Sequence, residues 1–413
     1  MGRLHRRPAL VRVAYYSPLP PSHSGIADYS ALLLPALRQR VEEVVIAQPG
    51  KRAPHADVAV YHIGNNPEAH GWIVDALRKR SGVVVLHELV LHHLIAGITL
   101  GRGEGRAYLD AMERDFGVAG RLLGLGVVDN LLPLIWETQP DRFPLTGTIL
   151  DLADGLIVHS RCVEQGVRRA GYAGPLWRIP HAGWPEHAVE PAELAGDPLV
   201  GCFGHLNINK RIPALLEAFS ILRQRRPGAR LLLVGETTER FDLDRRLERL
   251  GLGGDELIRE QWVSEDRFRS LMAACDVLVN LRSPTMGETS GSVIRGLGLG
   301  KPMLVSDVGW FAELPDGVAL KIPVDDYEAA TVAAALELAV DRRAELGRAA
   351  REYVAREHDL GRVADAYTAA LEEAAGGAVV TGAVLVRIAE AAAEIGFDDP
   401  VELARLAREA GLV

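Results

Sequence analysis

Short apolar runs rich in β-branched residues alternate with helical patterns over the first 180 residues of the chain. Strands and helices that alternate in this way form βαβ units, which build a parallel sheet. The runs that predict strands are residues 11–16, 44–47, 58–62, 83–87 and 155–159, and the helical patterns are residues 27–39 and 161–170.

The pattern stops at residues 181–198, which are rich in Pro, Gly, Ala and Glu and are predicted to be a linker. It restarts with predicted strands at 199–203, 229–234, 277–280 and 303–306 and a helix at 212–224. From residue 329 the chain is almost entirely helical in pattern. Two short amphipathic helices are predicted between residues 376 and 413.

The predicted fold class is therefore α/β, with two Rossmann-like, doubly wound domains that face each other across a cleft. Open parallel sheets bind ligands at the carboxyl ends of their strands, so the loops after strands are the candidate sites. The expected parts are an N-terminal domain (1–180), the linker (181–198), a C-terminal domain (199–360) and C-terminal helices (361–413).

The composition is that of an ordinary globular protein, with 48% hydrophobic and 24% charged residues, which excludes global disorder. The net charge of −9 argues against a non-specific nucleic-acid binder. Cys162, Cys202 and Cys275 lie too far apart in sequence for a disulfide framework or a zinc module. The cysteine usage predicts a reducing compartment and therefore a cytoplasmic protein.

The most apolar stretch, residues 122–136, is interrupted by Asp129 and Asn130 and is too short to span a membrane. The basic N-terminus (Arg3, Arg6, Arg7) lacks the apolar segment of a signal peptide. Peripheral contact with the inner face of the membrane and a homodimer both stay open. The helical stretch 96–136 is expected to be ordinary core, with an acceptor pocket or a membrane surface as alternatives.

The loop after the first strand, residues 17–29, leads directly into a helix. Gly25 permits close backbone approach, and free amides at a helix start suit an anion such as a diphosphate. The competing interpretation is a rigid loop in which Asp28 caps the helix. His87 ends another predicted strand, where it would contact substrate or serve as a buried structural histidine.

The loop at residues 204–211 follows the first strand of the second domain. Lysine is scarce in this chain, and Lys210 stands where its charge would meet a phosphate. The alternative is a surface lysine. His205 and Arg211 are further candidates for phosphate contact.

The loop at residues 282–292 follows a strand and opens a helix, so its amides and hydroxyls form another candidate anion site. The alternative is an ordinary capped helix start. Its candidate residues are Arg282, Glu288, Thr289, Ser290, Gly291 and Ser292.

In their order and spacing these motifs resemble the retaining glycosyltransferases of family 4, also called glycosyl transferase group 1, which have the GT-B fold. The resemblance covers roughly residues 10–370. It rests on residues 24–29, Gly204-His205-x4-Lys210-Arg211, Val234-Gly235-Glu236, Val263-Ser264, Cys275-Asp276-Val277, Gly300-Lys301-Pro302 and Gly309-Trp310-Phe311-Ala312-Glu313.

Three positions depart from the family pattern. The two glutamates of the family's Glu-x7-Glu segment fall at Gly287 and Arg295, with Glu288 one residue after the first. Histidine (His205) stands where the family has an arginine beside the phosphates. Because arginine accepts no hydrogen bond, either ribose recognition differs here or Glu288 takes over one of the two glutamate roles. Arg282, Arg211 or Arg295 would supply the missing positive charge.

The resemblance implies a metal-independent, retaining transfer of a sugar from a nucleotide-diphosphate sugar. No cofactor is expected, and the donor substrate is expected to be a UDP- or GDP-sugar. The acceptor would be a hydroxyl of a carbohydrate, a lipid-linked compound or a small molecule, as in polysaccharide biosynthesis. Lys210 and Glu288 would act at the donor, Gly235 and Arg295 near its nucleotide, and His87 near the sugar. Asp28, Tyr29 and His62 are expected on the acceptor side.

Two alternatives remain. One is a degenerate, non-catalytic GT-B protein that binds sugar nucleotides, favoured by the lost Glu-x7-Glu pair. The other is a GT-B epimerase or phosphorylase.

Overall fold

The computed structural model describes residues 11–22, 24–185, 189–237 and 241–376, together with the single residues 388, 392, 399 and 405. The basic residues of the N-terminus and the predicted helices of the tail lie outside the described residues. The chain divides into two compact units. The first comprises Met1–Pro180 and Gly361–Val413, and the second comprises His181–Leu360.

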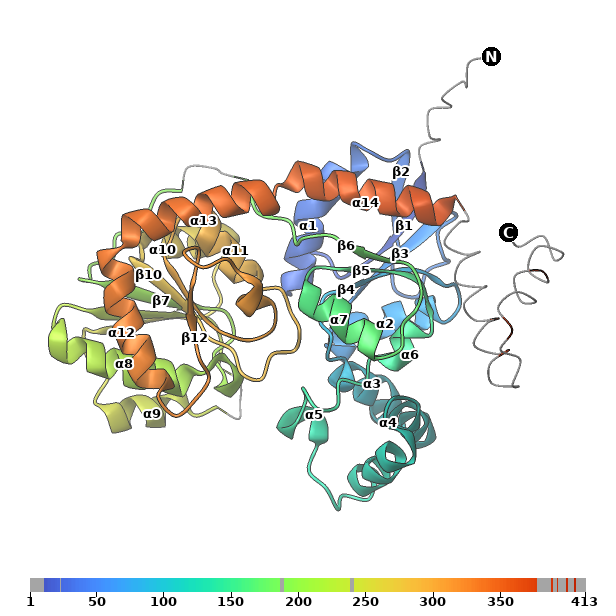
Figure 1. Cartoon of the computed structure of the whole chain (residues 1–413), viewed down its shortest axis with the longest axis horizontal. Coiled ribbons are helices and arrows are strands. Elements are labelled where there is room, and N and C mark those ends of the chain that lie inside the picture. The colour runs from blue at the N-terminus through green and yellow to red at the C-terminus, as the bar shows by residue number, and fades with distance from the viewer. Residues whose placement is uncertain are drawn as a thin grey trace, which may run out of the picture. The chain divides into compact units, whose positions relative to one another are not determined.

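A six-stranded parallel sheet forms the centre of the first unit (Figure 1). Its order is β2-β1-β3-β4-β5-β6, so the order reverses between β1 and β3. Its strands are β1 (Arg12–Tyr16), β2 (Glu43–Ile46), β3 (Val58–Ile63), β4 (Gly82–Leu86), β5 (Ala153–Val158) and β6 (Leu176–Arg178).

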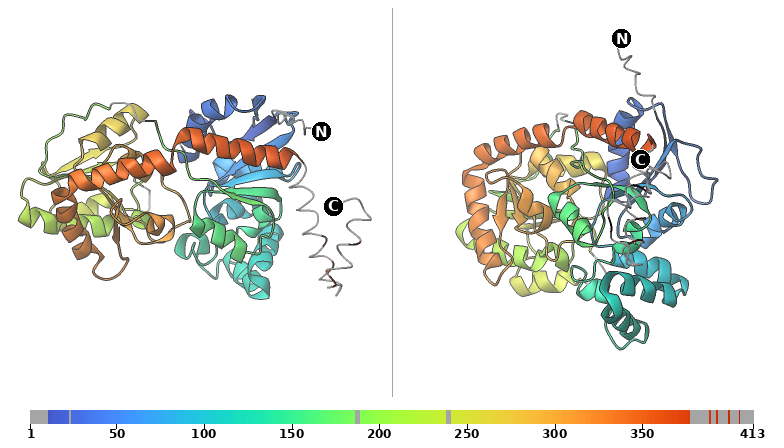
Figure 2. Two further views of the ribbon diagram at one scale, coloured as in Figure 1. Left: turned by 45° about the horizontal axis from the view of Figure 1, so that its top comes forward. Right: turned by 45° about the vertical axis from the view of Figure 1, so that its right-hand side comes forward.

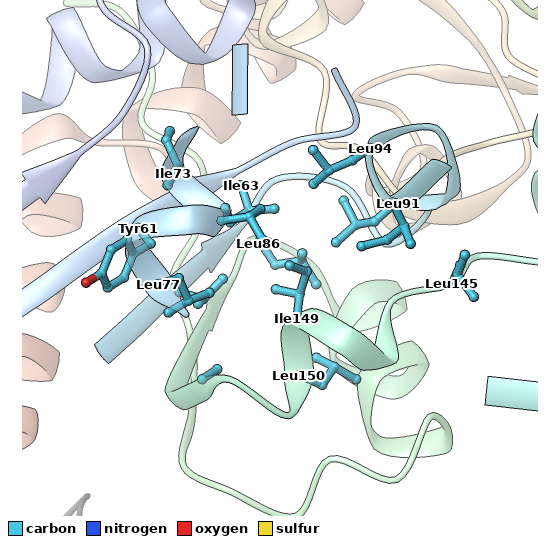
Figure 3. Close-up of a cluster of buried hydrophobic side chains, with 14 of the residues drawn as sticks. Tyr61, Ile63, Ile73, Leu77, Leu86, Leu91, Leu94, Leu145, Ile149 and Leu150 are labelled. Atoms are coloured by element: carbon cyan, nitrogen blue, oxygen red, sulfur yellow. The ribbon is translucent and has the colours of Figure 1, made fainter. Parts of the chain in front are cut away.

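Parallel strands need crossover connections, which helices supply in this unit. The core consists of apolar side chains from the strands and the helices packed on them (Figure 3), and Tyr61, Ile63 and Leu86 are at most 1% exposed. The helices are α1 (Gly25–Arg38), α2 (Pro67–Leu77), α3 (His92–Thr99), η1 (Leu100–Arg102), α4 (Gly105–Val128), α5 (Ile135–Thr138), α6 (Gly147–Leu150), α7 (Arg161–Arg169) and α14 (Leu360–Ala375).

The C-terminal helix α14 packs on the first unit. The hydroxyl of Tyr29 in α1 donates to the hydroxyl of Tyr367 in α14 at 2.8 Å, and both side chains are fully buried. Arg40 also pairs with Asp365. Residues from the end of the chain therefore complete the core that the first 180 residues begin.

The stretch 96–136 forms the helices α3, α4 and α5 at one end of the first unit (Figure 2). The expectation of ordinary core helix is wrong for part of it, because Val118, Leu122 and Leu131 are 67%, 63% and 79% exposed. Gly117 (φ 64°) breaks the helical backbone of α4. No helix within the described ranges combines the length and hydrophobicity that a membrane span needs.

The second unit contains another six-stranded parallel sheet, with the order β12-β11-β10-β7-β8-β9. Its order reverses between β7 and β10. Its strands are β7 (Leu199–Phe203), β8 (Arg230–Val234), β9 (Leu257–Glu260), β10 (Val277–Asn280), β11 (Met303–Ser306) and β12 (Leu320–Ile322).

Helices connect these strands and cover the sheet, with α8 and α12 packed on each other. The predicted doubly wound α/β architecture is thus confirmed in both units. The helices are η2 (Ile208–Lys210), α8 (Ile212–Arg225), α9 (Leu243–Leu250), α10 (Glu265–Ala274), α11 (Gly291–Gly298), η3 (Gly309–Glu313), α12 (Glu328–Asp341) and α13 (Arg343–Glu357).

Two glycines pack backbone to backbone where β7 and β8 end. Gly204 donates its amide to Val234 O at 2.8 Å, and Gly235 donates to Glu260 O at 2.8 Å. Gly235 has a φ of 139°, and a Cβ added there would lie 2.4 Å from Gly204 O. Only glycine fits this crossing, which brings the loops after the two strands together.

Replacement of Gly235 by alanine is expected to lower the free energy of unfolding by about 1–3 kcal/mol, because it adds backbone strain and a steric clash. The urea midpoint of unfolding measures this loss. Gly253→Ala is the matched control, since a Cβ there meets nothing within 4 Å. Equal stability of the two variants would contradict the close packing of the loops.

Candidate functional site

The candidate site of the second unit lies at the carboxyl edge of its sheet, at the strand-order reversal. The loop after β7 carries Lys210, and the loop after β10 carries Arg282 and leads to the start of α11. Both loops flank the point where β7 and β10 adjoin. Ligands of doubly wound sheets bind at this position.

Lys210 is buried there, with 6% of its surface exposed. Its ammonium donates to Phe203 O and lies 2.7 Å from the position of a Cβ on Gly204. Asn207 shapes the turn by accepting the Lys210 amide at 2.9 Å. Burial, and then the charge of Arg282, lower the pKa of Lys210 to about 8. Burial and a neighbouring cation both destabilise the charged form of Lys210, and a bound anion would stabilise it.

Arg282 and Glu288 form an ion pair within one loop. Arg282 Nε lies 2.7 Å from Glu288 Oε1, and Glu288 Oε2 accepts from Thr285 Oγ1 at 3.0 Å and from the Met286 amide at 2.8 Å. The amide of Arg282 donates to Ser306 Oγ at 2.8 Å. The carboxylate of Glu288 therefore organises the loop and keeps Arg282 in place.

The start of α11 is rich in hydroxyl groups. Ser290 caps the helix by accepting the Val293 amide, and its Oγ lies 3.0 Å from Ser292 Oγ. Asn280, at the end of β10, donates to Ser292 Oγ at 3.0 Å. Thr289 Oγ1 and Asn280 Oδ1 are buried without a hydrogen-bond partner among the described residues. Sequence reasoning missed Asn280, although its polar side chain ends an otherwise apolar strand.

A cavity of about 580 Å³ adjoins the ends of β8 and β9. Gly235, Glu236, Arg259 and Gln261 are among its lining residues. Gly235 was predicted on the nucleotide side, and the cavity lies beside it. His205 stands exposed in the neighbouring loop, one residue after Gly204.

Two predicted phosphate ligands are paired with carboxylates of other helices. The guanidinium of Arg211 pairs with the buried Glu328 of α12. Arg295 makes a bidentate ion pair with Glu265 at 2.9 and 3.1 Å, and its guanidinium stacks 3.5 Å above the ring of Trp184. Of the three arginines proposed to replace the missing phosphate charge, Arg282 is the one whose charge acts on Lys210, although it is also paired, with Glu288.

In the first unit, histidines from three adjacent strands meet at the carboxyl edge of the sheet. His62 Nδ1 lies 3.0 Å from His87 Nε2, and the rings of His87 and His159 are 5.1 Å apart. The ring of Tyr29 packs edge-on against His87 at 5.1 Å. All four side chains are buried.

The burial of His62 fixes how the pair is protonated. Burial lowers the pKa of His62 well below its ordinary value, so the ring is neutral. Its Nε2 has no hydrogen-bond partner among the described residues. An unpaired buried N–H is rare, so the proton belongs on Nδ1, which donates to His87 Nε2. His62 therefore orients His87.

The remaining predicted site residues of the first unit are of two kinds, exposed and buried. Gly25 and Asp28 are exposed at the start of α1, but the cap is Ser24, whose side chain accepts the Ala27 amide at 3.1 Å. The interpretation of Asp28 as the cap is therefore wrong. Tyr29 and His62 are fully buried, so direct contact with an acceptor is corrected to a packing role behind His87.

No cluster of three or more His, Cys, Asp or Glu side chains suited to a metal ion occurs in the part of the chain that the structure describes. The sequence contains one Asp-x-Asp spacing that sequence reasoning passed over, at Asp242 and Asp244. Asp242 caps α9 by accepting the Arg245 amide, and Asp244 pairs with Arg259. One carboxylate of this spacing therefore caps a helix, and the other forms an ion pair.

Residues 197–341 match the protein family described as "Glycosyl transferases group 1". This range contains the loops that carry Lys210, Arg282 and Glu288. No curated protein matches the sequence of the chain.

Several solved structures are similar to the chain. Sucrose-phosphate synthase from Thermosynechococcus elongatus is 20% identical over 87% of this chain and 98% of its own, with a TM-score of 0.58. Anabaena HepE in complex with UDP and glucose is 16% identical over 88% of this chain and 100% of its own, also with a TM-score of 0.58. The pneumococcal O-GlcNAc transferase GtfA in complex with UDP and GlcNAc is 12% identical over 76% of this chain and 57% of its own, at 0.52.

At these identities the likeness shows the fold. The chain therefore has the GT-B fold, and its residues 197–341 match the model of the glycosyl transferases group 1 family.

Proposed function

We propose that the chain is a retaining, metal-independent glycosyltransferase of family 4. It would transfer a sugar from a nucleotide-diphosphate sugar to a hydroxyl of a glycan, a lipid-linked compound or a small molecule. The second unit would bind the donor, and the first would supply His87 and the acceptor surface. The observation that carries the proposal is the buried ammonium of Lys210 beside Arg282, at the carboxyl edge of a glycosyl transferases group 1 domain.

The charge at this edge suits the chemistry of the donor. Cleavage of the anomeric bond leaves negative charge on the departing nucleoside diphosphate, and preorganised cations and amides stabilise such charge. Lys210 and Arg282 are cations from two different loops, and Ser290, Gly291 and Ser292 open α11 with hydroxyls and amides. The helix start adds its partial positive charge.

Glu288 is poorly suited to attack the sugar. Its carboxylate is paired with Arg282 and accepts two hydrogen bonds from its own loop, which stabilise the charge that a nucleophile must give up. This favours a retaining reaction in which the acceptor attacks from the side of the leaving group. A phosphate oxygen of the donor would take the proton of the acceptor.

The donor is proposed to be a UDP-sugar. Anabaena HepE and pneumococcal GtfA were solved with UDP, and both share the fold. A non-catalytic protein that binds sugar nucleotides is the second candidate, favoured by Arg295 at the position of the family's second glutamate and by its engagement with Glu265.

Replacement of Lys210 by alanine is expected to lower turnover by on the order of 10²–10³, because one preorganised charge on the leaving group is lost. A thermal-shift screen of UDP-, GDP-, ADP- and dTDP-sugars identifies the donor, since a bound ligand stabilises the folded state. Release of nucleoside diphosphate, with and without added acceptors, then measures turnover.

The matched control is Lys321→Ala, which removes a lysine of the same unit that pairs with the exposed Asp316. Unchanged turnover in a folded Lys210→Ala protein would refute the assignment of Lys210. Donor binding without any release of nucleoside diphosphate would instead favour the non-catalytic candidate.

The pH dependence follows from the burial of Lys210. Its pKa is lowered from 10.5 to about 8, so the free protein loses the ammonium as the pH rises through about 8. We therefore expect kcat/KM for the donor to be constant from pH 6.5 to 7.5 and to fall tenfold per pH unit above about 8. Lys210→Arg keeps its charge throughout this range and should remove the fall. If kcat/KM fell with the same midpoint pH in the unmodified protein and in Lys210→Arg, the assignment of the titrating group to Lys210 would be wrong.

A further inference from the structure

A second basic site lies on the outer helices of the second unit. A cavity of about 480 Å³ runs along α10, α11 and α13, which Figure 1 labels on this unit. Ala273 and Leu299 line it just before β10 and β11 begin, at the amino edge of the sheet. The Lys210 site lies at the opposite, carboxyl edge. The cavity shares no lining residue with the Lys210 site, although Trp184 and Arg295 at one end of it lie close to Gly291 at the start of α11.

Four cationic side chains line this cavity. They come from separate elements: Arg269 from α10, Arg295 from α11, Lys301 from the turn before β11 and Arg351 from α13. No aspartate or glutamate is among the described residues that line it. In a chain whose net charge is −9, such a concentration of positive charge is unusual. Walls of a single charge sign raise the local concentration of an oppositely charged ligand.

The cations are only partly compensated. Arg295 is paired with Glu265, whereas Arg269 and Arg351 have no acidic partner among the described residues. The ammonium of Lys301 donates to Ala273 O at 2.5 Å. Burial lowers the pKa of Lys301, Cys275 and Asp276 oppose this shift, and the charge of Arg351 adds a smaller lowering. Lys301 and Arg351 thus repel each other, and a bound anion would relieve this repulsion.

We propose that this basic cavity binds a small ligand through a phosphate or diphosphate group. Arg269 and Arg351 offer guanidinium groups that can bind phosphate oxygens in pairs, and Lys301 adds a compact charge to the same cavity. Trp184, Ile294 and Leu299 supply an apolar wall for the remainder of the ligand. The volume accommodates a sugar phosphate or a nucleoside diphosphate. This inference stands apart from the function proposed above, because Arg269, Lys301 and Arg351 are not part of the Lys210 site.

Equilibrium dialysis with radiolabelled pyrophosphate at constant ionic strength tests the cavity. The double variant Arg269→Ala/Arg351→Ala is expected to bind one pyrophosphate fewer per chain than the unmodified protein. Lys210→Ala reports on the other site, so failure of one assignment leaves the other measurable. The matched control is Arg249→Ala/Arg348→Ala, which removes two exposed arginines of the same unit outside the cavity.

Loss of one bound pyrophosphate in the cavity variant, with none lost in the control, supports the site. Unchanged binding in the cavity variant, or equal loss in both variants, overturns it. Circular dichroism checks folding, and the single variant Arg269→Gln, expected to weaken binding at least tenfold, replaces the pair if it fails to fold. Competition by UDP and by glucose 6-phosphate in the Lys210→Ala protein then distinguishes a nucleotide from a sugar phosphate as the ligand.

Discussion

The burial of one ammonium group is the constraint on which the site of the second unit depends. Lys210 has exchanged water for a backbone carbonyl and lies near Arg282, so the unliganded protein carries an electrostatic cost there. The crossing of Gly204 and Gly235 leaves room for the lysine side chain beside the strand ends. Proteins accept such a cost mainly where a ligand removes it, and a diphosphate carries the charge that would do so.

Arginines of the second unit are paired in three different ways, which differ in how far the sequence could reveal them. Arg211 is neutralised by Glu328, which lies 117 residues away in sequence, and Arg295 is neutralised by Glu265. Arg282 is held by Glu288 within its own loop. Arg269 and Arg351 keep their charge at the other edge of the sheet. Sequence spacing identifies the local pair, but ion pairs between distant elements depend on tertiary packing.

Much of the fold was predictable because central strands are buried on both faces and appear as continuous apolar runs. The strands that the pattern missed are β6, β9 and β12, which lie at the edges of the two sheets. Each has three or four residues and includes a charged one, such as Arg178 or Lys321, because an edge strand is only partly covered. In the site, Lys210 and the start of α11 were predictable from motif order, whereas the partners of Asn280 and His62 were not.

Proton uptake on ligand binding tests the central claim most directly. Titration calorimetry of UDP binding at pH 8.5, in buffers of different ionisation enthalpy, counts the protons taken up. Because an anion beside Lys210 raises its lowered pKa, the account predicts uptake of a substantial fraction of one proton, and none in Lys210→Arg. UDP binding without proton uptake, or the same uptake in both proteins, would contradict it.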